Sequence, residues 1–130
     1  MASIFTKIIN GEVPCYKISE NSKFIAILDV FPLVHGHVLV IPKKETDYIF
    51  DMDDTDLSEI MVFAKHVAKA LKLAVRCKRI GVAVIGLEVP HTHIHLVPMN
   101  SANDVNFTLP KLKPSEDELK SMAEKIRSKL

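Results

Sequence analysis

Three of the six histidines lie at alternate positions in the segment HTHIHLVP, which spans residues 91–98. Pro90 precedes the segment and β-branched residues are interleaved with the histidines, so a strand is favoured over a helix. Successive side chains of a strand point to opposite faces. One face is therefore expected to carry His91, His93 and His95, and the other, packed in the core, Thr92, Ile94 and Leu96.

A row of imidazoles fits three kinds of site. A metal ion could bind two of the three, because same-face neighbours are about 6.6 Å apart and the outer pair about 13 Å apart. Further ligands, such as His35 or His37, would then be needed. The second possibility is a polar strand face without chemistry. The third is catalysis, because imidazole, with a pKa near 6.5, is largely neutral at pH 7 and can attack phosphorus. His93 is best placed to attack, since the histidines on either side can donate hydrogen bonds to phosphate and protonate a leaving group.

The composition is that of one globular domain. Hydrophobic residues make up 48% and charged residues 25% of the 130 residues, which argues against disorder. The net charge of +1 gives no broad attraction to nucleic acid or to membranes, so neither is expected as a partner. Two cysteines are too few for a secreted disulfide scaffold, and no signal peptide or membrane-spanning run is present. A cytoplasmic location is expected.

Three helices are predicted around the histidine segment. The longest has apolar side chains at 3.6-residue spacing, begins at a cap provided by Thr55 or Asp56, and ends at about Val75. A short amphipathic helix is predicted at residues 3–10. A highly charged helix forms an extension at about residues 115–130.

Five strands are predicted, at residues 16–20, 24–30, 37–41, 79–85 and 91–99. Their hairpin-like spacing around one long helix predicts an α+β fold with a five-stranded antiparallel sheet. No repeat or linker divides the chain, so residues 1–130 are expected to form a single domain.

Four segments together resemble the histidine triad (HIT) family, in particular its Hint-like bacterial branch. HTHIHLV is similar to the family's His-x-His-x-His pattern followed by apolar residues, and HGHVLVIPKK resembles the strand before its long helix. IFTKIINGEVPCYKI resembles the family's N-terminal segment, and FIAILDVFP its ribose-contacting strand. The segments occur in the family's order.

The resemblance implies a homodimer whose two sheets join, and an enzyme that needs no cofactor. It implies attack on the α-phosphorus of a purine nucleotide, giving a nucleotidyl-histidine that water hydrolyses. Adenosine 5′-phosphoramidates and dinucleoside polyphosphates are the expected substrates.

Roles for individual residues follow from the same resemblance. His93 is expected to be the nucleophile, His91 and His95 to support it and contact phosphate, and His37 to complete the cluster. Asp29 is expected to accept hydrogen bonds from the ribose hydroxyls. An apolar slot for the base is expected to consist of Ile4, Phe5, Ile8, Leu28 and Val30.

The segment before the histidines departs from the family pattern. Relatives commonly have a Gly-Gln-Ser or Gly-Gln-Thr segment there, whereas this chain has Leu87 and Glu88, followed by Val89. An ionised Glu88 about 4 Å from a phosphate would be repelled by roughly 4 kcal/mol at an effective dielectric of 20. Glu88 is therefore expected to point away, to be protonated, or to act on a cationic or amine leaving group. Glu88 and Val89 are both predicted to be substrate-binding residues. Ser3 and Thr6 stand where some relatives have zinc-binding cysteines, so no metal site is expected.

Two other functions stay open on the sequence alone. The altered segment suggests a nucleotide-binding or signalling module with weak or no catalysis. Five histidines in two nearby segments suggest, less strongly, a metal-binding protein.

Overall fold

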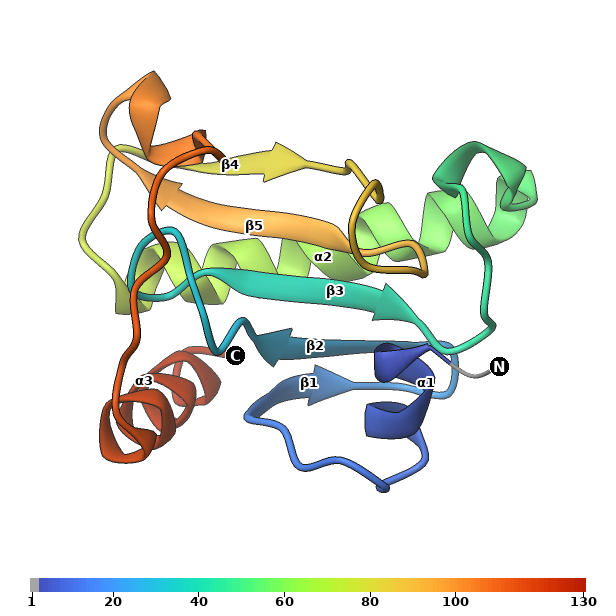
Figure 1. Ribbon diagram of the computed structural model, residues 1–130, viewed down its shortest axis with the longest axis horizontal. Helices are drawn as coiled ribbons and strands as arrows, with labels where there is room; N and C mark the ends of the chain where they lie inside the picture. Colours follow the sequence, from blue (N-terminus) through green and yellow to red (C-terminus); the bar gives the residue numbers. More distant parts are fainter. Residues whose placement is uncertain (1–2) are drawn as a thin grey trace.

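The computed structural model describes residues 3–130, which form one five-stranded antiparallel sheet flanked by helices (Figure 1). In the order β1-β2-β3-β5-β4, the strands are β1 (Lys17–Glu20), β2 (Phe24–Leu28), β3 (Val38–Pro42), β5 (Ile94–Met99) and β4 (Arg79–Ala83). The helices are α1 (Ile4–Ile9), α2 (Asp54–Ala74) and α3 (Glu116–Arg127), with short 3₁₀ turns η1 (Ile49–Asp51) and η2 (Ala102–Val105). The predicted α+β fold with five antiparallel strands is confirmed.

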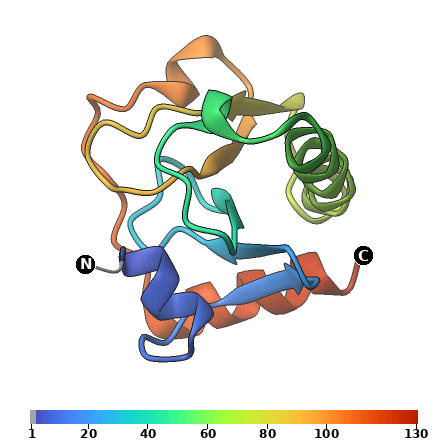
Figure 2. The ribbon, with the colours of Figure 1, turned by 90° about the vertical axis from the view of Figure 1, so that its right-hand side faces the viewer.

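Side-chain alternation along the central strands gives the sheet two apolar faces. On β2, Ala26 and Leu28 belong to the core cluster that includes α2 and α3, whereas Ile25 and Ile27 cluster with Phe5 of α1. Figure 2 shows α1 on one side of the sheet and α2 on the other. Because both faces are covered, β2 and β3 are buried along their whole length.

The larger core lies under α2. Ile60, Val67 and Leu71 of this helix are at most 1% exposed. The helix is capped by Asp53, whose carboxylate accepts a hydrogen bond from the backbone N–H of Asp56. The predicted cap at Thr55 or Asp56 is therefore wrong, because both residues already lie in the first helical turn.

Several strand ends also differ from the prediction. β2 ends at Leu28, because the chain turns at Asp29, whose side chain accepts a hydrogen bond from the backbone N–H of Phe31. β3 includes Pro42, which pairs with Phe24 as the last residue of the strand. β4 ends at Ala83. β5 begins only at Ile94, three residues later than predicted.

The C-terminal helix is part of the main core. Leu119, Ala123 and Ile126 pack in the cluster beneath α2, and the Arg127 guanidinium donates a hydrogen bond to the backbone carbonyl of Lys17 on β1. Ser115 caps this helix. Over residues 3–130, no helix is both long enough and apolar enough to cross a membrane.

Candidate active site

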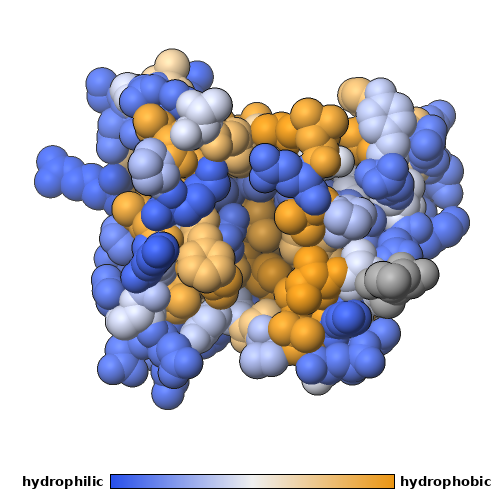
Figure 3. Space-filling view, in the orientation of Figure 1, coloured by the Kyte–Doolittle hydropathy of each residue, from blue (hydrophilic) through white to orange (hydrophobic). Residues whose placement is uncertain are grey.

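Four of the six histidines, His37, His91, His93 and His95, lie on the α1 face of the sheet, close to Phe5 or to one another. His95 of β5 lies opposite Leu39 of β3, and His37 immediately precedes β3. Seen from this side, the middle of the molecule is hollowed and lined largely by hydrophobic residues (Figure 3). The fold therefore brings together His37 and His95, which are 58 residues apart in the sequence.

His93 has the arrangement that a nucleophile requires. Its Nδ1 lies 2.8 Å from the backbone carbonyl oxygen of His91. A carbonyl can only accept, so Nδ1 carries the ring proton and Nε2 keeps its lone pair. Burial lowers the pKa of His93, while the hydrogen bond to His91 opposes that shift. The ring is thus neutral at neutral pH, with its basic nitrogen free.

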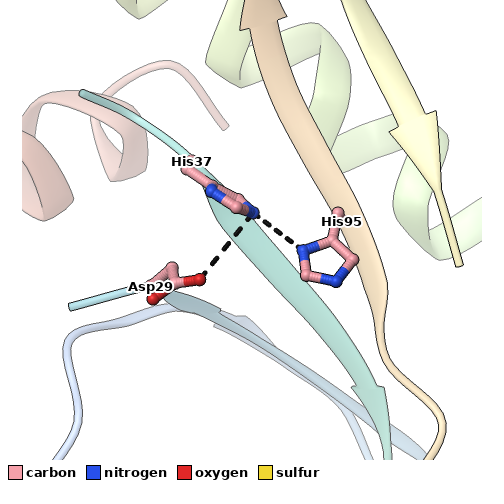
Figure 4. Close-up of side chains that lie close together, drawn as sticks. All are labelled: Asp29, His37 and His95. Atoms are coloured by element: carbon pink, nitrogen blue, oxygen red, sulfur yellow. Dashed lines mark hydrogen bonds and ion pairs between the residues drawn. The ribbon is translucent and has the colours of Figure 1, made fainter. Parts of the chain in front are cut away.

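His37 and His95 form a hydrogen-bonded relay in which the ring protons lie on Nε2, whereas the ring proton of His93 lies on Nδ1. The backbone N–H of Leu33 donates to His37 Nδ1 at 3.1 Å, so the ring proton of His37 lies on Nε2. That proton is donated to His95 Nδ1 at 2.8 Å (Figure 4). The ring proton of His95 must then lie on Nε2, which can donate to a ligand. Burial lowers the pKa of His37 to about 3 and that of His95 to about 4.

Asp29 completes the cluster at the end of β2. Its Oδ1 accepts from the N–H of Phe31 at 3.0 Å, and its Oδ2 lies 3.8 Å from His37 Nε2. The side chain is 23% exposed, and burial raises the pKa of its carboxyl group. Oδ2 can therefore accept hydrogen bonds from a bound ligand.

The donor atoms of Asp29, His37 and His95 lie within 4.8 Å of one another, a spacing that a metal ion could bridge. A metal would need the lone pair of His37 Nε2. The ring proton of His37 would then have to move to Nδ1, where it would face the N–H of Leu33 and break that hydrogen bond. This geometry favours a hydrogen-bonded relay over a metal centre.

His91 supports the site from beneath. It is 1% exposed, its Nε2 donates to the carbonyl of Pro42 at 2.9 Å, and its Nδ1 lies 2.7 Å from the hydroxyl of Ser3. Both ring nitrogens are engaged by protein atoms, which leaves neither free for the phosphate contact expected from the sequence. The predicted strand through His91 and His93 is wrong, because β5 begins at Ile94. The rings of His91 and His93 pack against Phe5, with ring centroids 5.8 and 4.8 Å away.

The predicted apolar slot is only partly assembled. Phe5 and Ile8 lie together on the α1 face, and Ile4 and Val30 are 43% and 40% exposed. Leu28 does not join them, because it faces the α2 core. Ile27 takes its place beside Phe5. The sequence carried the signal, since Ile27 is two residues from Asp29 and therefore shares its face of the strand.

The segment that departs from the family pattern forms an exposed loop after β4. Leu87 is 88% exposed, Val89 is 40% exposed, and Glu88 forms no ion pair within residues 3–130. The carboxylate close to the triad is instead that of Glu45, 3.7 Å from His91 Nδ1.

Two residues near the histidines were not foreseen. The segment between η2 and α3 crosses the end of the sheet where β2 ends (Figure 1), anchored by a hydrogen bond from Leu112 N–H to the Pro32 carbonyl. Phe107 in this segment packs against His95 at 4.7 Å, and Lys111 lies over the Phe107 ring. The charge of Lys111 lowers the pKa of His95. An irregular segment offers no periodicity that would place these side chains.

Known proteins are similar to this chain in sequence and in fold. The model of the HIT domain matches residues 10–102. An adenosine 5′-monophosphoramidase of Schizosaccharomyces pombe is 31% identical over 132 residues, covering 100% of this chain and 99% of its own. An adenosine 5′-monophosphoramidase of Candida albicans is 32% identical, covering 98% and 90%. A crystal structure of a HIT-like protein from Bartonella henselae superimposes with a TM-score of 0.84 at 29% identity, covering 98% of this chain and 96% of its own.

Proposed function

Because the chain belongs to the HIT domain family, we propose that it hydrolyses adenosine 5′-phosphoramidates or dinucleoside polyphosphates through a nucleotidyl intermediate on His93. The chain is an enzyme of the histidine triad nucleotide hydrolase type. The observation that carries the proposed mechanism is the hydrogen bond from His93 Nδ1 to the His91 carbonyl, because it leaves Nε2 free to attack.

In the first step, the lone pair of His93 Nε2 forms a bond to the α-phosphorus. The bond from phosphorus to the leaving amine or phosphate breaks, and the leaving group departs with the bonding electrons. His95 Nε2 passes its proton to the departing atom. In the second step, water attacks phosphorus and passes a proton back to His95 Nε2, the N–P bond breaks, and AMP is released with His93 and His95 restored.

The apolar residues of the α1 face support the binding of a purine base. Phe5 and Ile27 provide buried surface, and the side chains of Ile4 and Val30 are partly exposed. Asp29 lies at the end of the neighbouring strand, with Oδ2 free to accept from ribose hydroxyls. The base, ribose and phosphate would thus lie in sequence across the sheet.

The direct test is mass spectrometry of the enzyme quenched during turnover of adenosine 5′-phosphoramidate. A covalent AMP adduct on the peptide that contains His93 is the expected result. Nucleotide binding by calorimetry without turnover or adduct would instead favour a binding module, the function suggested by the exposed loop at Glu88.

Asp29→Asn is expected to raise KM for adenosine 5′-phosphoramidate about tenfold, because a hydrogen bond to a charged group contributes roughly 1.5–3 kcal/mol. The amide oxygen can still accept from Phe31, so the turn should persist. With a 2′,3′-dideoxy substrate, wild type and variant should have equal KM values. An equal tenfold rise in KM for both substrates would show that Asp29 does not bind ribose.

The proposal includes a homodimer in the cytoplasm. β4 is an edge strand of the sheet, and its Val82 is 55% exposed. Two such edges paired across a two-fold axis would join the sheets and cover Val82.

Sedimentation equilibrium is expected to give twice the mass of one chain. Val82→Lys should shift the protein toward monomer, because it would oppose two ammonium groups across the axis. Wild-type protein that stays monomeric at high micromolar concentration would contradict the dimer.

A further inference from the structure

A hydrogen-bonded cluster, buried at Ser3 and His91 and exposed at Glu45, joins the N-terminal segment to the histidine segment. Its members, which we name the N-terminal tether, are Ser3, Thr6, Glu45 and His91. The hydroxyl of Ser3 lies 2.7 Å from His91 Nδ1 and accepts from the backbone N–H of Thr6 at 3.0 Å. Since His91 Nε2 must donate to the Pro42 carbonyl, Nδ1 is an acceptor and the hydroxyl of Ser3 donates to it.

Glu45 holds the serine in place. Its Oε1 accepts from the backbone N–H of Ser3 at 2.8 Å and from the hydroxyl of Thr6 at 2.9 Å. These hydrogen bonds, led by the one from Ser3, lower the pKa of Glu45 to about 2, so the carboxylate is ionised at neutral pH. A charged acceptor fixes the start of α1 relative to the segment after β3.

The tether ends at the group that orients the nucleophile. The ring of His91 is held at both nitrogens, and the next residue, Thr92, donates its backbone N–H to the Thr46 carbonyl at 2.9 Å. The peptide between these anchors includes the His91 carbonyl, which accepts from His93 Nδ1. The contact from Ser3 to His91 spans 88 residues of sequence and is buried.

We propose that Ser3, held by Glu45, is a positioning residue for His93: through His91 it fixes the carbonyl that keeps the nucleophile's proton on Nδ1. This inference rests on the proposed function of His93. The tether does not touch substrate. Its loss should therefore lower kcat, with little change in nucleotide binding.

Ser3→Ala removes both the donor to His91 and the cap of α1, so a matched control is needed. Ser115 caps α3 in the same way, accepting from the backbone N–H of Glu118 at 3.1 Å, and lies outside the site. Ser3→Ala is expected to lower kcat about tenfold or more with KM within about twofold, because small displacements of a reacting group are costly. Ser115→Ala should leave both constants unchanged, and Ser3→Thr, which keeps the hydroxyl, should restore most of kcat.

A second measurement needs no activity. Long-range ¹H–¹⁵N NMR spectra of the histidine rings should show the proton of His93 on Nδ1 in the wild type and a mixture of tautomers in Ser3→Ala. Glu45→Gln, which alters an exposed side chain, should give the same change at smaller amplitude and serves if Ser3→Ala does not fold.

The two proposals fail separately. Wild-type protein without turnover would refute the proposed function, while a tautomer change in Ser3→Ala or Glu45→Gln would still support the tether. An unchanged His93 tautomer in a folded variant, or wild-type kcat in Ser3→Ala, would overturn the inference about Ser3.

Discussion

His93→Ala is expected to lower kcat for adenosine 5′-phosphoramidate by about 10⁴-fold or more, because removal of a covalent nucleophile leaves only binding and electrostatic stabilisation. Of the two ring nitrogens His93 Nε2 and His95 Nε2, the hydrogen bonds leave a free lone pair only on that of His93. No neighbouring ring can substitute, since His95 presents a proton and both nitrogens of His91 are engaged.

Binding and folding should survive this substitution. Calorimetry is expected to give an AMP affinity within about tenfold of the wild type, because the ribose and base contacts are retained. His66→Ala provides the matched control, since His66 is an exposed residue of α2 outside the site. Turnover by His93→Ala within tenfold of the wild type would refute covalent catalysis by this residue.

The second large effect concerns stability in acid. Between pH 7 and pH 4 the free energy of unfolding is expected to fall by at least about 3 kcal/mol, since one pKa unit corresponds to about 1.4 kcal/mol. The pKa of His37 is lowered by burial from 6.5 to about 3, and that of His95 from 6.5 to about 4.

The sign of this effect follows from proton counting. Well above pH 6.5 both rings are neutral in the folded and the unfolded chain, so they add no pH dependence. As the pH falls below 6.5, the unfolded chain takes up protons that the folded chain refuses, and unfolding becomes easier. The loss continues to about pH 4 for His95 and about pH 3 for His37.

Urea denaturation at pH 7, 5.5 and 4 measures the effect. His37→Gln removes one of the two buried titrating rings while its amide can still donate to His95, so it should lose roughly half of the pH dependence. His66→Gln, at an exposed position, should leave the slope unchanged. An identical slope in His37→Gln and the wild type would contradict the role assigned to His37.

The sequence predicted the fold, and which side chains of the candidate site lie on one face, because both depend on periodicity. Alternation along β2, β3 and β5 decides which side chains meet on the α1 face, and helical spacing identified α2. Strand ends were less predictable, since the turn at Asp29 depends on a local hydrogen bond to Phe31. Leu28 was predicted on the wrong face of β2, because residues of a strand alternate between faces. Asp29 could have shown this, since Ile27, two residues before it, shares its face.

Polar contacts between residues far apart in the sequence could not be predicted from sequence patterns. Nothing in the types of Ser3 or Glu45 indicates that they meet His91, because the contact requires α1 and the segment after β3 to be in their final places. The same holds for Phe107 and Lys111, which follow the last strand without regular spacing.

Main-chain groups set the proton positions of His37, His91 and His93: the Leu33 amide and the carbonyls of Pro42 and His91. Every residue but proline supplies the same amide, and every residue supplies the same carbonyl. The positions of the ring protons therefore depend on the path of the backbone. They can persist when many of the surrounding side chains are substituted. Substitutions in the exposed loop at Leu87 and Glu88 would therefore leave the free lone pair on His93 Nε2 in place.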